Sequence, residues 1–303
     1  MPLEKKLTHF AVLGPGGVGG LLAGLLSREG HRVTVVASES TAQHIAAHGL
    51  RVESASFGDF TADVPAVPEL TEPADVLIVA TKATSLEAAL RRVPAGQVRD
   101  AVVLPLLNGF EHVDLLRAHY PEAHVSAAGI RVESTRVAPG RIRQTSPFTA
   151  LELARPGMPE GRIEALAERL RGTGFTVKVS DDEARTLWEK FHFLLPTALV
   201  CAHARQAVSG VRTERRDDLV DVMAEVAAVA AEYGVSLDSA RVLETVDAVP
   251  PGTKPSMLRD REAGRPMEVD ALGGALLRAA RRVGVDVPVT ARIVADLERV
   301  TPS

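Results

Sequence analysis

The chain has 303 residues, which favours two domains at about 100–200 residues each. Its composition, 46% hydrophobic and 24% charged, is that of an ordinary globular protein, and a net charge of −4 argues against nucleic acid as the main partner. The single cysteine, Cys201, excludes an internal disulfide and is expected to be a buried, inert thiol.

The N-terminal stretch MPLEKKLTHF carries charge but lacks the apolar core of a signal peptide. No apolar run of the sequence is long enough to span a bilayer. These observations predict a cytoplasmic protein with no membrane partner.

Short apolar runs alternate with helical patterns in the first half of the chain. The runs cover residues 10–13, 32–37, 76–80 and 101–104. This alternation predicts an α/β domain, a doubly wound parallel sheet covered by helices. Further strand-like runs at 124–133, 141–152 and 175–179, with a helical pattern at 161–174, extend the predicted sheet to about residue 180.

The composition changes after the segment SDDEA at 180–184. Alanine, leucine and arginine dominate from there on, and strand-like runs disappear. Helical patterns cover residues 185–209, 213–233, 237–247, 268–283 and 288–300, with a loop at 249–256. The sequence therefore predicts a Rossmann-type domain over 1–181 and an all-helical domain over 182–303.

A glycine cluster follows the first predicted strand. Gly14, Gly16 and Gly19 form G-x-G-x-x-G between a strand and a helix, the context in which this pattern binds a dinucleotide. The first glycine permits a tight turn, the second lets a pyrophosphate approach, and the third allows close helix–strand packing. Gly17 and Val18 begin the helix whose free amides and dipole hold the anion. The alternative is a tight turn without a ligand.

The end of the second predicted strand bears on the choice between NAD and NADP. An acidic residue there binds the ribose 2′-hydroxyl of NAD, and a basic residue receives the 2′-phosphate of NADP. Ser38 and Ser40 offer hydrogen bonds to a phosphate, whereas Glu39 repels it. Three basic residues elsewhere are candidates to approach the phosphate, namely Arg28, His31 and Arg51. These residues leave both cofactors open.

Four later stretches carry a resemblance. They are VLIVATKATSLEAAL (76–90), LPLLNGFEHVDLL (104–116), LWEKFHFLLPTALVCA (187–202) and KPSMLRDREAGRPMEVDALGGALLRAARRVGVDVPVT (254–290). With the glycine cluster, they make the chain resemble the ketopantoate reductase (2-dehydropantoate 2-reductase) family over nearly its whole length. The resemblance implies a Rossmann domain followed by a helical domain that serves substrate binding and dimerisation. It also implies NADPH-dependent reduction of ketopantoate to pantoate, on the pathway to pantothenate and coenzyme A.

The resemblance further implies roles for five side chains. Lys190 matches the catalytic lysine of the family, and Glu268 matches the glutamate that supports the reacting centre. Asn108 matches an asparagine beside both cofactor and substrate. Ser256 matches a serine that binds substrate, and Lys82 matches a lysine near the nicotinamide ribose.

Three positions depart from the family pattern. Ser38 stands where members often carry an arginine for the 2′-phosphate, and Leu194 replaces an asparagine four residues after the catalytic lysine. A second substrate asparagine has become Val208 or Ser209. We therefore expect a less polar substrate pocket, and a different 2-oxo acid, carbonyl or imine substrate stays open as an alternative.

The predicted chemistry divides between cofactor and protein. The nicotinamide supplies the hydride, so the protein must orient and polarise the carbonyl and deliver a proton to the alkoxide. Lys190 suits that task as a cation with a proton to donate. Glu268 can orient a substrate hydroxyl or the lysine, while Asn108 and Ser256 can anchor the substrate through neutral hydrogen bonds.

Each of these residues also has a structural interpretation. Lys190 is then a solvated helix residue, and Asn108 belongs to a simple N-G turn. Glu268 is then a surface residue paired with Arg265, and Ser256 is a helix N-cap.

Other residues near Lys190 are interpreted as structural. His192 and His203 have no metal-ligand spacing with Cys, His or carboxylates, so no metal site is predicted. Trp188 and Phe191 have helical spacing and are expected in the core.

A function from another class is a nicotinamide-binding sensor or scaffold without catalysis. The combination of Lys190, Ser256 and Glu268 disfavours it, because a pure binder needs none of them for chemistry. Oxidation of NADPH or NADH with a panel of 2-oxo acids separates the classes. The predicted partner is a small 2-oxo acid, and a homodimer is left open.

Overall fold

The computed structural model describes residues 8–300, so residues 1–7 of the N-terminal stretch lie outside the described residues. The described chain forms two compact units. Unit 1 extends to Leu107 and resumes from His112 to Thr186, whereas unit 2 consists of Asn108–Glu111 and the chain from Leu187 onward. Helix α6 (Glu183–Ala204) starts in unit 1 and continues into unit 2.

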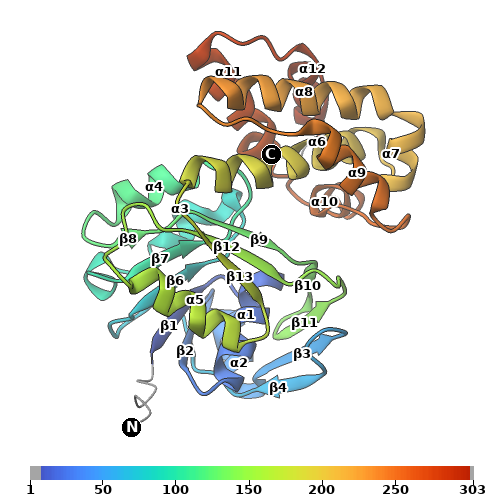
Figure 1. Cartoon of the computed structure of the whole chain (residues 1–303). Coiled ribbons are helices and arrows are strands. Elements are labelled where there is room, and N and C mark those ends of the chain that lie inside the picture. The colour runs from blue at the N-terminus through green and yellow to red at the C-terminus, as the bar shows by residue number, and fades with distance from the viewer. Residues whose placement is uncertain (1–7, 301–303) are drawn as a thin grey trace. The chain divides into compact units, whose positions relative to one another are not determined.

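The main sheet of unit 1 has six parallel strands in the order β5-β2-β1-β6-β7-β8 (Figure 1). Their bounds are β1 His9–Leu13, β2 Arg32–Val36, β5 Ala66–Val67, β6 Val76–Val79, β7 Val102–Pro105 and β8 His124–Val125. Counted along the chain, these strands follow the 3-2-1-4-5-6 order of a Rossmann fold. The reversal lies between β1 and β6, where Leu13 is in register with Val79.

Helices cover this sheet, as the sequence predicts for strands that are apolar throughout. The helices of unit 1 are α1 Gly17–Arg28, α2 Glu39–His48, α3 Leu86–Leu90, α4 His112–His119 and α5 Arg162–Gly172. Two 3-10 turns add Ala83–Ser85 and Ala95–Gln97. All five residues of β1 are buried, as are Leu21, Leu22, Leu25 and Leu26 of α1. The fold class predicted from the sequence is confirmed.

The expectation of one sheet continuing to residue 180 is wrong, because unit 1 contains three sheets. A four-stranded sheet has the order β10-β11-β3-β4, and a three-stranded sheet has the order β13-β12-β9. Their bounds are β3 Leu50–Ser54, β4 Phe60–Ala62, β9 Ala128–Arg131, β10 Ser134–Ala138, β11 Arg141–Gln144, β12 Ala150–Ala154 and β13 Thr176–Ser180.

Two predicted runs each divide between sheets. The run at 141–152 separates into β11 and β12, with Pro147 in the break. Proline has no amide hydrogen to donate, which disfavours a continuous strand there. The run at 124–133 separates into β8, which pairs in parallel with β7, and β9, which pairs antiparallel with β12.

The four-stranded sheet packs against α1 through a stripe of glycines. A Cβ atom on Gly17 would collide with the carbonyl oxygen of Ser134, and one on Gly20 would crowd Ile142. A Cβ atom on Gly24 would lie 3.2 Å from Val52. Small residues on this face of α1 therefore let the sheet approach the helix closely.

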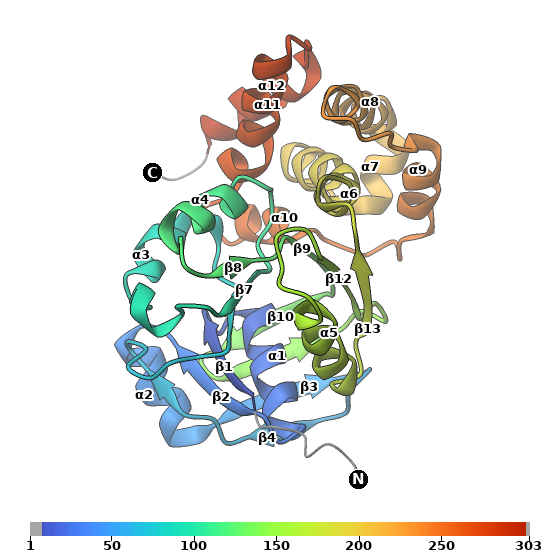
Figure 2. The ribbon, with the colours of Figure 1, turned by 60° about the vertical axis from the view of Figure 1, so that its left-hand side comes forward.

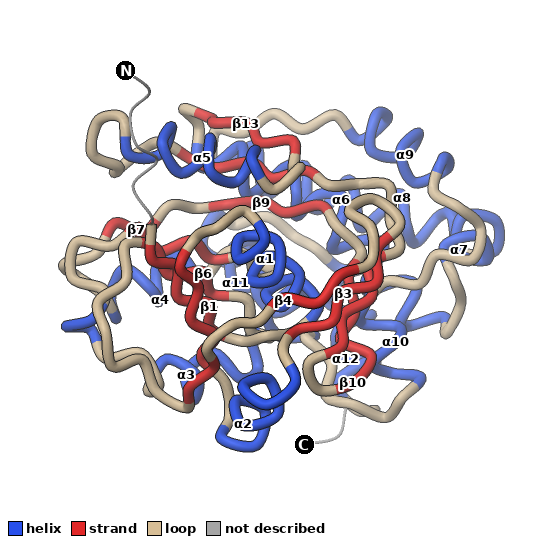
Figure 3. The backbone as a smooth tube through the Cα atoms, turned by 90° about the horizontal axis from the view of Figure 1, so that it is seen from below, coloured by secondary structure: helices blue, strands red, loops and turns tan. Residues whose placement is uncertain are grey.

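In the described residues, unit 2 contains helices and loops without strands (Figures 2 and 3). Its helices after α6 are α7 Val208–Glu214, α8 Arg216–Glu232, α9 Ser239–Ala248, α10 Ser256–Glu262, a π-helical turn Asp270–Gly274, α11 Ala275–Val283 and α12 Pro288–Glu298. The predicted helix at 185–209 ends earlier, at Ala204, because Arg205 adopts a φ of 57°.

The core of unit 2 agrees with the sequence at several positions. Trp188 and Phe191 are buried, and their rings pack against Phe110 with centroids 5.1 and 5.0 Å away. Cys201 is fully buried, and that burial raises the pKa of its thiol to about 12, so it stays protonated and inert.

None of the helices in residues 8–300 is long and apolar enough to cross a membrane. The same part of the chain holds no group of three or more His, Cys, Asp or Glu residues arranged to bind a metal ion.

Candidate active site

The glycine turn between β1 and α1 is closed by backbone hydrogen bonds. The amide of Gly14 donates to Val36 O at 3.0 Å, and the amide of Gly16 donates to Gly14 O at 2.8 Å. Gly14 has a φ of 90°, a conformation that favours glycine. The turn therefore crosses from β1 to α1 at the point where the strand order reverses.

The space around Gly16 and Gly19 agrees with the roles that these positions have in a dinucleotide-binding turn. A Cβ atom on Gly16 would meet only the carbonyl oxygen of Ala80, at 3.8 Å, among the described residues beyond its chain neighbours. A Cβ atom on Gly19 would instead collide with Gly14 O. Position 16 thus has room for a ligand, and position 19 requires glycine for helix–strand packing. Gly17 and Val18 begin α1, whose first amides have no partner within the helix.

Thr81 is a feature of this turn that the sequence analysis missed. Its methyl group would lie 2.8 Å from a Cβ atom on Gly14, and its buried hydroxyl has no hydrogen-bond partner within residues 8–300. Thr81 and Lys82 follow β6, so they share the carboxyl edge of the sheet with the glycine turn. The adjacency of β1 and β6 in a Rossmann sheet is the signal that points to Thr81.

Ser38 lies at the carboxyl end of β2, in the N-cap position of α2. Its hydroxyl is exposed and donates to Thr41 Oγ1 at 3.0 Å. Glu39 and Ser40 beside it are also exposed. The position is therefore open to a ribose or its phosphate.

The three basic residues considered for the 2′-phosphate lie elsewhere in unit 1. Arg28 donates to Phe57 O at 2.8 Å and lies over the ring of Phe60. His31 is buried and precedes β2, at the end of that strand opposite to Ser38. Arg51 belongs to β3, beyond the far end of α2, and lies 3.7 Å from Glu53. These neighbours give no support to their suggested role, which stays a prediction.

In unit 2, Asn108 and Glu268 are brought into contact. Asn108 Nδ2 donates to Glu268 Oε2 at 3.3 Å, although the two residues are 160 positions apart in the chain. Glu268 is buried, so its interpretation as a surface residue is wrong. Arg265, its suggested partner, is 2.9 Å from Asp260.

Lys190 lies in α6 and is buried, which contradicts its interpretation as a solvated helix residue. Leu194 follows it by one helical turn, so the two side chains share a face of the helix. Leu194, which replaces the asparagine of the family pattern, therefore lies beside the predicted catalytic lysine.

Ser256 is the exposed first residue of α10, and the N-cap is Pro255. Because Pro255 holds the N-cap position, the N-cap interpretation of Ser256 is wrong. Val208 begins α7 and is buried, with its amide donating to Thr253 O at 3.0 Å. Ser209 next to it is half-buried.

Both histidines of α6 bond to neighbouring helices. His192 Nε2 lies 3.2 Å from Met223 O and 3.0 Å from Ser239 Oγ. Burial lowers the pKa of His192 and favours the neutral ring. His203 Nε2 lies 2.9 Å from Asp296. These partners account for Nε2 of both rings without a ligand.

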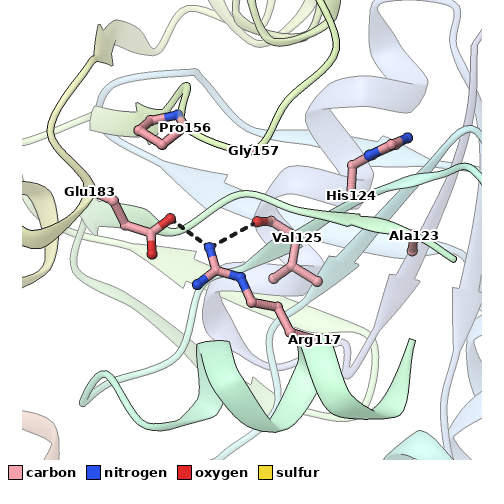
Figure 4. Close-up of a pocket in the computed structure, with 7 residues that line it drawn as sticks. All are labelled: Arg117, Ala123, His124, Val125, Pro156, Gly157 and Glu183. Carbon is pink, nitrogen blue, oxygen red and sulfur yellow. Dashed lines mark hydrogen bonds and ion pairs between the residues drawn. The ribbon is translucent and has the colours of Figure 1, made fainter. Parts of the chain in front are cut away.

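A surface hollow in unit 1 is lined by none of the predicted site residues (Figure 4). The ion pair of Arg117 with Glu183, at 2.6 Å, crosses it, and Arg117 also donates to Val125 O. Its His124 lies 3.1 Å from Asp100. With its cation already paired, the hollow offers no surplus charge to a ligand.

Comparison with known proteins covers nearly the whole chain. Two family models match, ketopantoate reductase PanE/ApbA over residues 10–155 and its C-terminal part over residues 182–300. The chain is 31% identical over 295 residues to a 2-dehydropantoate 2-reductase of Mycobacterium tuberculosis, covering 93% of this chain and 94% of the relative. It is 30% identical over 300 residues to the uncharacterized oxidoreductase YkpB of Bacillus subtilis, covering 95% and 97%.

A solved structure gives the same result. The crystal structure of a PanE/ApbA family ketopantoate reductase from Ralstonia eutropha JMP134 has a TM-score of 0.87 and 29% identity, covering 96% of this chain and 98% of that one. The family and the glycine turn together indicate use of a nicotinamide cofactor. The chain therefore belongs to the ketopantoate reductase PanE/ApbA family and is an NAD(P)H-dependent oxidoreductase.

Proposed function

We propose that this protein reduces ketopantoate to pantoate with NADPH. The observation that carries the proposal is the contact of Asn108 with Glu268 in unit 2, which joins two of the residues that match the family's reacting centre. The buried Lys190 of the same unit supports it. A sensor or scaffold has no need of this combination.

When bound, the nicotinamide would supply a hydride to the C2 carbonyl carbon. Lys190 polarises the carbonyl oxygen with its positive charge and transfers a proton from Nζ to that oxygen, which yields the hydroxyl of pantoate. Because Lys190 is buried, its interaction with the developing charge is stronger than in water. Lys190 then regains a proton from solvent.

Glu268 accepts a hydrogen bond from the substrate hydroxyl at C4. A carboxylate repels the substrate carboxylate, so this assignment also fixes which end of ketopantoate lies at Glu268. Asn108 holds Glu268 through its amide and donates its other N–H to substrate or cofactor. Ser256, with its exposed hydroxyl, anchors the substrate carboxylate.

In unit 1, the glycine turn binds the pyrophosphate at the amides that begin α1. Lys82, exposed after β6, binds near the nicotinamide ribose. Ser38 donates to the 2′-phosphate through its hydroxyl, which gives NADPH a modest preference over NADH.

A second candidate is the reduction of a different 2-oxo acid or related carbonyl or imine. Leu194 favours it, because an apolar side chain one turn after Lys190 cannot bond to a polar substrate group. The test is the rate of NADPH and NADH oxidation with a panel of 2-oxo acids that differ in the C4 hydroxyl.

A homodimer stays a prediction, for which light scattering of the purified chain is the test.

A further inference from the structure

Arg278 of α11 bonds to two separate segments of unit 2. Its Nε and Nη2 donate to the two carboxylate oxygens of Glu111 at 3.0 and 2.7 Å. Its Nη1 donates to Asp270 Oδ1 at 2.6 Å, and its Nη2 also reaches Asp270 O at 3.2 Å. One planar guanidinium thus joins the loop after β7 to the π-helical turn.

These two segments carry Asn108 and Glu268. Glu111 stands three residues after Asn108, and Asp270 stands two residues after Glu268. The side chains of Asn108 and Glu268 meet at 3.3 Å. Arg278 therefore fixes both backbones whose spacing determines whether that contact forms.

The loop after β7 is held on unit 2 by packing as well. Gly109 has a φ of 84° and lies so close to Ala271 O that a Cβ atom would collide with it. The ring of Phe110 packs on Trp188 and Phe191. Consequently Asn108–Glu111 belongs to unit 2, while the chain on either side of it belongs to unit 1.

The arrangement requires an arginine. Two donors on one edge of the guanidinium engage Glu111, and a third engages Asp270. A lysine ammonium is a single point charge and cannot span both acceptors with this geometry. Glu111 and Asp270 also raise the pKa of Arg278, which is charged at any working pH.

We propose that Arg278, through Glu111 and Asp270, is a positioning residue that sets the Asn108 amide against the Glu268 carboxylate for carbonyl reduction. This rests on the proposed function of Asn108 and Glu268. The side chain of Arg278 is about as exposed as that of Glu111, 36% against 33%, so this ion pair contributes little to the overall stability of the protein. Its effect is on geometry, where a displacement of about 1 Å can cost 10²-fold in rate.

The test compares Arg278→Gln, Arg278→Lys and Glu111→Gln with Arg216→Gln as a matched control. Arg216 also forms a bidentate pair, with Asp247 at 2.9 Å, and both partners are 41% exposed. Hydrogen exchange is measured over residues 106–112 and 266–274. Turnover is measured with NADPH and the best 2-oxo acid of the panel.

We expect Arg278→Gln to increase exchange in both segments and to lower kcat about tenfold or more, with the Kd for NADPH near wild type. Glu111→Gln should give a smaller loss, and Arg278→Lys should not restore the rate. Arg216→Gln should leave both readouts unchanged.

Three results overturn the proposal. They are unchanged exchange in Arg278→Gln, unchanged kcat despite increased exchange, and full activity of Arg278→Lys. A wild type that reduces no acid of the panel refutes the proposed function instead, and the exchange data alone then decide whether Arg278 holds the two segments.

Discussion

Among single residues, Lys190 bears the largest part of the proposed chemistry, because we propose it as the proton donor to the carbonyl oxygen. We expect Lys190→Ala to lose about 10²-fold or more in kcat while the Kd for NADPH stays near wild type. Lys178→Ala is the control, since Lys178 lies in unit 1 and pairs with Glu152 at 2.9 Å. Steady-state kinetics and calorimetric titration measure both quantities. Near-normal turnover of Lys190→Ala would remove Lys190 from the mechanism.

Ser38 is the residue that we propose sets how strongly the protein discriminates between the cofactors. A neutral hydrogen bond contributes about 0.5–1.5 kcal/mol and a charge-assisted one about 1.5–3 kcal/mol, so an arginine at this position should increase the preference for NADPH about tenfold. The exposed site has room for that side chain. We expect Ser38→Arg to act mainly by tightening NADPH, as measured by kcat/KM for both cofactors.

The alternative for this position is recognition of a ribose hydroxyl by Glu39. In that case the wild type prefers NADH, and Glu39→Ala abolishes the preference. Such a result would contradict the proposed NADPH preference.

At the scale of single residues, the sequence predicted the burial of some side chains but not their partners in space. Burial of Trp188 and Cys201 followed from their chemical nature. The partner of Glu268 did not, because Arg265 is near in sequence whereas Asn108 is near in space. Thr81 was missed since its orphaned hydroxyl is visible only once β1 and β6 lie side by side.

Among the elements, the turn into α1 makes the sharpest prediction. Gly16 has φ −72° and ψ −163°, which any residue adopts, and open space beside it. We expect Gly16→Val to keep the fold and its Tm but to abolish binding of NADPH and NADH, because the side chain occupies the approach of the pyrophosphate.

Gly17→Ala provides the contrasting variant. Its Cβ would collide with the backbone of Ser134, whose hydroxyl donates to Gly17 O at 2.8 Å. We expect Gly17→Ala to lower the Tm of the unliganded protein, as seen by circular dichroism. Unchanged cofactor affinity in a folded Gly16→Val would refute the dinucleotide site.

The helices and strands also show which features of the fold the sequence pattern did not predict. The short apolar runs correctly predicted β1, β2, β6 and β7, since buried strands leave a strong apolar pattern in the sequence. It did not assign strands to sheets, because β10, β11, β3 and β4 pair through contacts distant in sequence. The sequence pattern also did not predict α7 and α10 as separate helices. Both are short, and local breaks at Arg205 and Pro255 precede them.

For the whole molecule, two divisions of the chain have different physical causes. One is the change in composition near residue 182, and the other is the division into two units. Composition responds to strand and helix propensity, while the units reflect which side chains pack together. Phe110 illustrates the difference, since its ring joins Trp188 and Phe191 although the chain on either side of Asn108–Glu111 belongs to unit 1. No local pattern predicts that assignment.

The central claim is that the chain reduces ketopantoate with NADPH. The most direct measurement is kcat/KM for ketopantoate and for 2-oxo acids without its C4 hydroxyl, with NADPH and NADH, in the wild type and in Leu194→Asn. We predict the highest value for ketopantoate with NADPH, and a larger preference for ketopantoate in Leu194→Asn because the amide restores a polar contact. Reduction of another 2-oxo acid in preference to ketopantoate, or no reduction of any, would contradict the account.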